Sequence, residues 1–201
     1  MFEICPRCGG YSDRALVENG RLVCPHCGYS APFRHLPLFY LSGASGAGKS
    51  TAARILFDTR SEFITMECDI LWHERFNTPE NGYADFRDAW LRLAANYAQY
   101  GKSTLLCGCV TPDQIESRPR RRYFSDVHFM AIVLSDDEFR RRGEKRGFQA
   151  AHMESSLQFN RWLRENGAAN GMHIIDATDM TPRETADCAA GYVLAHLEKE
   201  A

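Results

Sequence analysis

One stretch decides the fold of this chain, Gly43-Ala44-Ser45-Gly46-Ala47-Gly48-Lys49-Ser50. Its glycine-rich backbone can turn inward, so that successive N–H groups point at phosphate oxygens. An apolar run at residues 38–41 precedes it and is typical of a short buried strand, and residues 51–57 favour a helix. A helix that begins directly after such a loop adds the positive end of its dipole. The pattern predicts a strand, a phosphate-binding loop (P-loop) and a helix.

The residue types at the end of the loop indicate the ligand. Lys49 would reach the β- and γ-phosphates of a nucleoside triphosphate, and the Ser50 hydroxyl would bind Mg²⁺. We therefore expect ATP and Mg²⁺ to bind here. The residues expected at the nucleotide are Gly43, Ala44, Ser45, Gly46, Ala47, Gly48, Lys49, Ser50 and Thr51.

Two C-x-x-C pairs come earlier in the chain, Cys5/Cys8 and Cys24/Cys27, each followed by glycine. A C-P-x-C-G turn exposes backbone N–H groups toward thiolate sulfur, and two such turns supply four tetrahedral sulfur ligands for Zn²⁺. The spacing predicts a structural zinc ribbon; a redox dithiol is the alternative. His26 lies within the second turn and is expected to be a bystander. So short a segment has too little core to fold alone, so zinc would supply much of its folding free energy.

Composition excludes several classes of protein. The net charge of the 201 residues is −2, so no overall basic field attracts nucleic acid or a membrane. No apolar run approaches the length of a transmembrane helix, and the N-terminal residues lack the pattern of a signal peptide. Four of the eight cysteines have metal-site rather than disulfide spacing. We therefore expect a cytoplasmic protein.

Apolar runs alternate with helical patterns along the rest of the chain. Pro32 and Pro37 bracket a linker, which suggests a zinc ribbon at residues 1–35 and a P-loop domain at 36–201. Such alternation predicts an α/β fold, a parallel sheet with helices on both faces. Beyond the P-loop, strands are expected at residues 62–69, 103–110, 127–134 and 172–176, and helices at 82–100, 136–146, 153–165 (with Trp162 inward) and 182–197.

Residues 36–200 resemble small P-loop kinases of the nucleoside and nucleoside-monophosphate kinase group. The resemblance is carried by the P-loop, by Glu67 and Asp69 after the second strand, by Arg142 and Arg146, and by the run Ile174-Ile175-Asp176-Ala177-Thr178. Further segments look like a bacterial subset labelled only as nucleoside kinases or P-loop ATPases: 107–112, 121–124 and 158–163. The zinc ribbon is an addition to the common kinase plan.

The resemblance implies roles for several residues. Lys49 would hold the donor, and Asp69 would orient or deprotonate the acceptor hydroxyl. Glu67 is a second candidate acid at this site. Arg142 and Arg146 share a helix face and would close as a lid onto the transferring phosphate. Solvated surface is the default for Arg140, Arg141 and Lys145.

Two further groups lie where such kinases cover the acceptor. Arg118, Arg120, Arg121 and Arg122 form either a solvated loop or a contact with an acceptor phosphate. Aromatic side chains would either stack a base or pack in the core; these are Trp72, Phe76, Tyr83, Phe86 and Trp90, with His73 beside them. Cys68, Cys107 and Cys109 fit small buried positions.

One departure from the usual NTPase pattern stands out. The third strand of the P-loop domain ends without an aspartate, so the Mg²⁺ ligands beyond Ser50 stay open. The leading hypothesis is an ATP- and Mg²⁺-dependent kinase of a small acceptor, a nucleoside or nucleotide. A polynucleotide-end kinase that uses the ribbon is less favoured. A non-enzymatic ATP-dependent switch, with the ribbon contacting a protein partner, is the third alternative.

Overall fold

Strand β4 (Leu38–Gly43) lies at the centre of the larger sheet, and all of its residues are buried. In the computed structural model, which describes residues 2–12 and 14–200, the sheet has five parallel strands in the order β5-β6-β4-β7-β8. Burial on both faces requires helices on both sides. The other strands are β5 (Ile64–Glu67), β6 (Thr104–Cys107), β7 (Val127–Val133) and β8 (Met172–Asp176).

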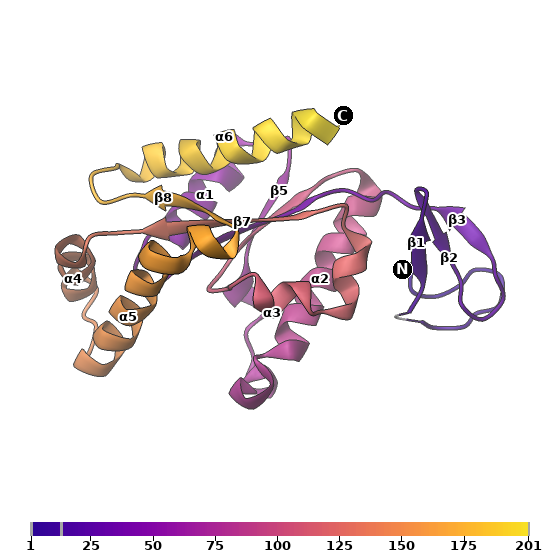
Figure 1. The fold of residues 1–201 in the computed structure, drawn as a ribbon, viewed down its shortest axis with the longest axis horizontal. Helices are drawn as coiled ribbons and strands as arrows, with labels where there is room; N and C mark the ends of the chain where they lie inside the picture. Colours follow the sequence, from indigo (N-terminus) through magenta and orange to yellow (C-terminus); the bar gives the residue numbers. More distant parts are fainter. Residues whose placement is uncertain (1, 13, 201) are drawn as a thin grey trace.

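Successive side chains of β4 enter two separate apolar layers, because side chains alternate across a strand. Phe39 and Leu41 pack with α1 and α6, whereas Leu38 and Tyr40 pack with α2 and α3. Figure 1 shows the two pairs of helices on opposite sides of the sheet. The α/β architecture with covered faces is therefore confirmed. The helices are α1 (Lys49–Thr59), α2 (Ala84–Tyr100), α3 (Asp113–Glu116), α4 (Asp136–Lys145), α5 (Ala150–Asn166) and α6 (Pro182–Glu200).

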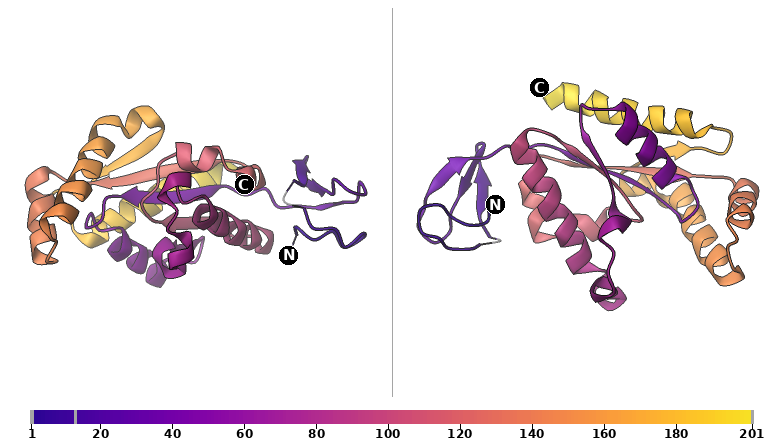
Figure 2. Two further views of the ribbon diagram at one scale, coloured as in Figure 1. Left: turned by 90° about the horizontal axis from the view of Figure 1, so that it is seen from below. Right: turned by 180° about the vertical axis from the view of Figure 1, so that it is seen from behind.

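A small antiparallel sheet forms from the N-terminal segment, in the order β1-β2-β3. It lies at one end of the molecule beside α2 (Figure 2). Gln99 of α2 exchanges two 3.0 Å hydrogen bonds with the backbone of Arg34, and the Phe2 ring contacts Tyr123 with centroids 4.9 Å apart. The two sheets share no strand among the described residues. The strands are β1 (Leu16–Glu18), β2 (Arg21–Val23) and β3 (Ser30–Pro32).

Two predicted strands are shorter than expected. The chain leaves β5 after Glu67 and forms the 3₁₀ turn η1 (Cys68–Leu71), so Asp69 lies on a turn rather than in the strand. The Cys68 carbonyl accepts a hydrogen bond from the Trp90 indole at 3.1 Å. Strand β6 likewise ends at Cys107.

The helical prediction was also wrong in one detail. Trp162 of α5 was expected to point inward but is 36% exposed, and it stacks on Phe159 instead. Leu157 and Leu163 supply the buried contacts of this helix, so the apolar stripe is narrower than the sequence suggests. Within the described residues, the helices are all too short or too polar to cross a bilayer.

Candidate active site

The P-loop, residues 43–50, joins the end of β4 to the start of α1. Gly43 and Gly48 have φ angles of 149° and 115°, in the region that favours glycine. A Cβ at Gly43 would lie 2.8 Å from the Ile132 carbonyl oxygen on β7, so any side chain would force the strands apart. The loop thus depends on glycine at its entry and at the helix start.

The Lys49 side chain folds back over this loop. Its buried ammonium group donates hydrogen bonds to the carbonyls of Gly43 and Ala44, at 2.8 and 3.0 Å. A cavity of about 830 Å³, here called the P-loop cavity, opens beside it. The cavity is lined by residues 45–51, Asp69, Cys109, Glu138, Arg141, Arg142, Lys145, Arg146, Thr178–Pro182 and Thr185.

Glu67 lies beside the residue expected to bind Mg²⁺. Its Oε1 atom is buried and has no hydrogen-bond partner among the described residues. Burial raises the pKa of Glu67, and the neighbouring Ser50 hydroxyl partly offsets this rise. An orphaned carboxylate oxygen beside a hydroxyl matches the preference of Mg²⁺ for oxygen ligands. The residues present therefore fit a magnesium ion at Ser50 and Glu67.

Arg142 of α4 is fastened across the P-loop. Its terminal nitrogens donate to the carbonyls of Ala47 at 3.2 Å and Ala177 at 3.1 Å, and its Nε donates to Glu138 at 2.6 Å. Arg146, one turn later, lines the same cavity. The structure thus brings the two predicted lid arginines together with Lys49.

Two further cations line this cavity while remaining exposed, as the sequence predicted for them, but their place at the site was not predicted. Arg141 and Lys145 are four residues apart, the spacing already noticed for Arg142 and Arg146, so the same signal was available. Hydrogen bonds from Arg141 and then Arg142 lower the pKa of Glu138 to about 2. One ionised carboxylate therefore holds two of the four cations that line this side of the cavity, Arg141 and Arg142.

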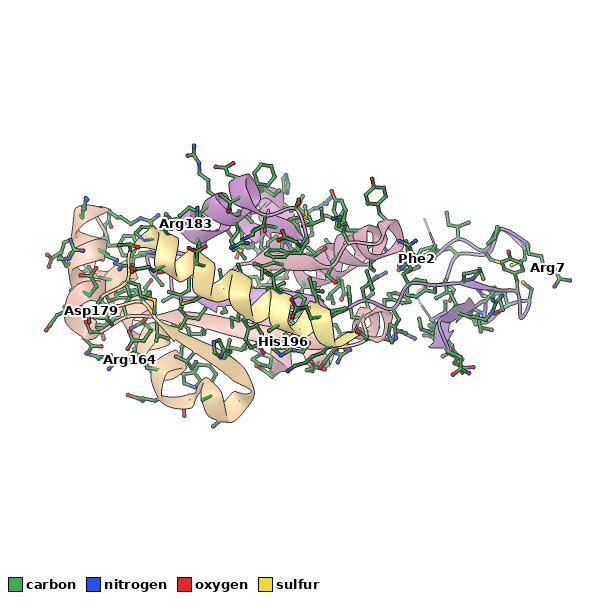
Figure 3. The ribbon with its side chains drawn as sticks, turned by 90° about the horizontal axis from the view of Figure 1, so that it is seen from above. Phe2, Arg7, Arg164, Asp179, Arg183 and His196 are labelled. Atoms are coloured by element: carbon green, nitrogen blue, oxygen red, sulfur yellow. The ribbon has the colours of Figure 1, made fainter. Side chains whose placement is uncertain are left out.

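The loop between β8 and α6 closes the far side of the P-loop cavity. The Thr178 hydroxyl donates to Asp176 at 2.6 Å and accepts from the Ser135 amide at 2.8 Å, which ties this loop to the start of α4. Figure 3 labels Asp179 in this loop, at the opposite end of the P-loop domain from Phe2. No described ribbon residue lines the P-loop cavity.

A second cavity, the aromatic cavity, has a volume of about 310 Å³. Asp69 and Cys109 line both cavities, so the two spaces meet at these residues. Cys109 was expected to be buried, but it is exposed. The residues lining the aromatic cavity are Tyr40, Cys68, Asp69, Trp72, Asn77, Tyr83, Phe86, Arg87, Trp90, Gly108, Cys109, Val110 and Ile115.

Most of the predicted aromatic residues line this second cavity, but two do not. His73 caps the turn η2 (Glu74–Phe76) by accepting from the Arg75 amide, and Phe76 packs against Phe86 from outside. Sequence reasoning missed Arg87, whose position between Tyr83 and Trp90 on the same helical stripe was the available signal.

Arg120, Arg121 and Arg122 contact other protein groups, and Arg120 links the ribbon to the P-loop domain. Arg120 is buried and pairs with Glu3 of the ribbon at 3.0 Å and with Asp88 of α2 at 3.4 Å. Arg121 pairs with Glu116 and Asp126, and Arg122 donates to the Pro119 carbonyl. The idea that this run holds an acceptor phosphate or a polynucleotide end therefore has no support from these contacts.

The four cysteines of the ribbon converge on one point. Their sulfur atoms all lie within 4.8 Å of one another, with Cys5–Cys27 at 3.7 Å and Cys8–Cys24 at 3.9 Å. A tetrahedral zinc with bonds of about 2.3 Å requires sulfur atoms about 3.8 Å apart. The Cys8 amide, the largest influence, lowers the pKa of the Cys5 thiol to about 6. The cluster therefore fits Zn²⁺, and His26 is not part of it.

Comparison with known proteins adds the fold class. The sequence matches no family model, and no curated protein matches it significantly. Solved structures do match. A sugar kinase from Janibacter is 22% identical with a TM-score of 0.54, over 81% of this chain and 95% of that one. Shikimate kinase from Acinetobacter baumannii is 15% identical with a TM-score of 0.55, over 82% and 96%.

The tunicamycin resistance protein of Deinococcus radiodurans is 14% identical with a TM-score of 0.58, over 80% of this chain and 96% of that one. The fold is that of the small P-loop kinases. These structures are matched over nearly their full length, whereas about a fifth of the present chain lies outside each match. Identities this low compare folds only, so the activity has to be argued from the site.

Proposed function

We propose that this protein is an ATP- and Mg²⁺-dependent phosphotransferase that acts on a small acceptor. The observation that carries the proposal is the position of Asp69, where the P-loop cavity and the aromatic cavity meet. The first cavity has the groups that hold a triphosphate, and the second has the size and aromatic lining of a small-molecule site. A carboxylate at their junction can contact both the triphosphate in the first cavity and an acceptor in the second.

The donor half consists of the P-loop, Lys49 and the α4 arginines. The loop amides and Lys49 hold the β- and γ-phosphates, and Arg142 and Arg146 stabilise the charge that spreads over the phosphoryl oxygens during transfer. Ser50 and Glu67 would hold Mg²⁺, which would supply neutralisation of phosphate charge. Thr178–Pro182 flank the adenosine side of the cavity.

The acceptor half supplies orientation and a base. Asp69 accepts the proton of the acceptor hydroxyl as that oxygen attacks the γ-phosphorus of ATP. The new acceptor–phosphorus bond replaces the bond to the β-γ bridging oxygen, ADP leaves, and the proton is released later to water. The walls of the aromatic cavity exclude water from this step.

The acceptor itself is a small hydroxyl or phosphate compound. Trp72, Tyr83 and Phe86 line the aromatic cavity and offer faces for stacking a base, which supports a nucleoside or nucleotide. Solved structures of the same fold include sugar, gluconate and shikimate kinases, so these acceptors belong in the test as well. The ribbon, residues 1–35, serves as a zinc-dependent structural unit beside the kinase domain, residues 36–201, and its reduced thiolates suit the cytoplasm.

Acceptor-stimulated ADP formation tests the proposal. Zinc- and magnesium-loaded protein is incubated with ATP and a panel of nucleosides, nucleotides, sugars, sugar acids, shikimate and RNA ends. At least one small acceptor should raise ADP production above the rate with ATP alone, and Lys49→Ala should abolish the increase. The proposal would be wrong if no acceptor stimulated ADP formation and the wild type formed ADP no faster than Lys49→Ala.

A further inference from the structure

Arg87 is the single cation among the described residues that line the aromatic cavity. It projects from α2, is 9% exposed, and fixes its Nε by donating to the Gly82 carbonyl at 2.8 Å. This bond leaves the two terminal nitrogens for other partners. Among the described residues neither of them has a hydrogen bond, and no carboxylate lies within 4.0 Å of the group.

A buried arginine without an acid partner is unusual in this molecule. Arg120, equally buried, has Glu3 and Asp88 as counter-charges. The carboxylate whose charge acts on Arg87 is Asp113 at the start of α3, but it forms no ion pair with Arg87 and does not line the aromatic cavity. Burying a charge without a counter-charge costs free energy. A ligand of opposite charge would offset that cost.

The other charged residue that lines this cavity is Asp69. Asp69 is the sole carboxylate among the described lining residues, and it marks the junction with the P-loop cavity. The aromatic cavity therefore has one positive and one negative group within an otherwise mostly apolar wall. A ligand that carries an anionic group and a hydroxyl matches both.

We propose that Arg87 binds an anionic group of the acceptor, a carboxylate or a phosphate, and so directs the acceptor hydroxyl toward Asp69. A guanidinium with two free terminal nitrogens can hold either oxyanion bidentately, which a lysine cannot do. This inference rests on the proposed phosphotransferase function. It makes Arg87 a specificity-determining residue and excludes neutral sugars and unphosphorylated nucleosides as preferred acceptors.

Matched acceptor pairs test this assignment: gluconate with glucose, shikimate with its methyl ester, and cytidine monophosphate with cytidine. The wild type should prefer the charged member of at least one pair, and which pair responds separates carboxylate from phosphate. Arg87→Met should lower kcat/KM for that charged acceptor by roughly 10- to 100-fold, the equivalent of one lost charge-assisted contact. Arg87→Lys should keep only part of the wild-type kcat/KM for that acceptor.

Two controls keep the outcomes distinct. Arg54→Met, an exposed arginine of α1 outside both cavities, should change neither acceptor preference nor ATP affinity. Preference for the neutral members, or an equal loss for both members in Arg87→Met, overturns the role of Arg87 while the phosphotransferase function stands.

Direct binding decides the matter if no acceptor is phosphorylated, the result that defeats the proposed function. Trp72 and Trp90 line the cavity, so their fluorescence reports occupancy by the same six compounds without turnover. Saturable quenching by a charged compound that Arg87→Met weakens roughly 10-fold or more supports the anion site. Equal quenching of wild type and variant, or none, overturns it.

Discussion

The carboxylate of Glu3 accepts a hydrogen bond from the Arg120 guanidinium at 3.0 Å, although 117 residues separate them in the chain. The Glu3 side chain is fully buried, and its other oxygen lies 3.0 Å from Arg92 of α2. Asp88 completes a balanced set of two acids and two bases between ribbon and P-loop domain. The ion pairs of Glu3, together with the contacts of Phe2, therefore fix the ribbon on the P-loop domain.

Removing this carboxylate should destabilise the protein. Glu3→Gln leaves Arg92 without an acid partner and Arg120 with Asp88 alone. Breaking a buried pair from one side costs about 3 kcal/mol, the lower end of the usual range, and the lower end applies because Arg92 is partly exposed. Urea unfolding should show that loss in the free energy of unfolding. Glu18→Gln, on the exposed edge of β1, is the matched control and should change little. Equal stabilities of the two variants would contradict a structural role for the network.

Zinc should be needed by the ribbon but not by the nucleotide site. Cys24→Ser should abolish the binding of one zinc per chain and lower the melting temperature, whereas ATP affinity should stay within about threefold because no described ribbon residue lines the P-loop cavity. Metal analysis and isothermal calorimetry give the two readouts. Cys188→Ser, at an exposed cysteine away from the cluster, should keep its zinc. Retention of zinc by Cys24→Ser would rule out the four-cysteine site.

Glu67 predicts a pH-dependent stability of defined sign. Its folded pKa lies above the ordinary value because of burial, so the native state binds a proton more tightly than the unfolded chain. The free energy of unfolding should therefore fall as pH rises from the ordinary value of 4.5 through the raised pKa. Glu67→Gln should be more stable than wild type at pH 7 without Mg²⁺, and the gain should vanish near pH 4.

Magnesium and a second acid provide the checks on that result. Mg²⁺ should stabilise the wild type more than Glu67→Gln. Glu62 has the opposite tendency, because backbone N–H groups of Glu62 and Ser61 lower its pKa, so Glu62→Gln should show no gain at pH 7. A Mg²⁺ response that survives unchanged in Glu67→Gln would remove Glu67 from the metal site.

Arg142 should matter more to transfer than to folding. Arg142→Met removes a cation held over the P-loop by the carbonyls of Ala47 and Ala177, and kcat should fall by roughly 10²- to 10³-fold, as for other preorganised charges. Arg140→Met, two residues away on the exposed face of α4, should keep kcat within about twofold. Steady-state kinetics compare the two, and similar kcat values would exclude a role for Arg142 in the transition state.

Much of the fold was predictable because its signals are local. The P-loop at residues 43–50 and the apolar runs around it indicate parallel strands, and the two C-x-x-C pairs predict the sulfur cluster. Strand ends were less predictable. Asp69 lies beyond the end of β5, where the Cys68 carbonyl bonds to Trp90, a residue 22 positions away that sequence periodicity does not detect.

Site residues were predictable where their spacing along the sequence brings them together. They were not predictable where their partners are remote in sequence. Arg142 and Arg146 are one helical turn apart, so their shared cavity could be expected. For Arg120 the sequence left a solvated loop and a phosphate contact open, and its actual partner Glu3 is remote in sequence. Arg87 was missed because its place in the aromatic cavity depends on tertiary structure.

The central claim is that Asp69 acts where the two cavities meet. Its most direct test follows γ-labelled phosphate from ATP to the acceptor found in the panel, in a single turnover with wild type and Asp69→Asn. Both proteins should bind ATP within about threefold of each other, while transfer by Asp69→Asn should be slower by roughly 10²- to 10⁴-fold, the usual contribution of a general base. Equal transfer rates, or label that moves only to water in the wild type, would contradict the account.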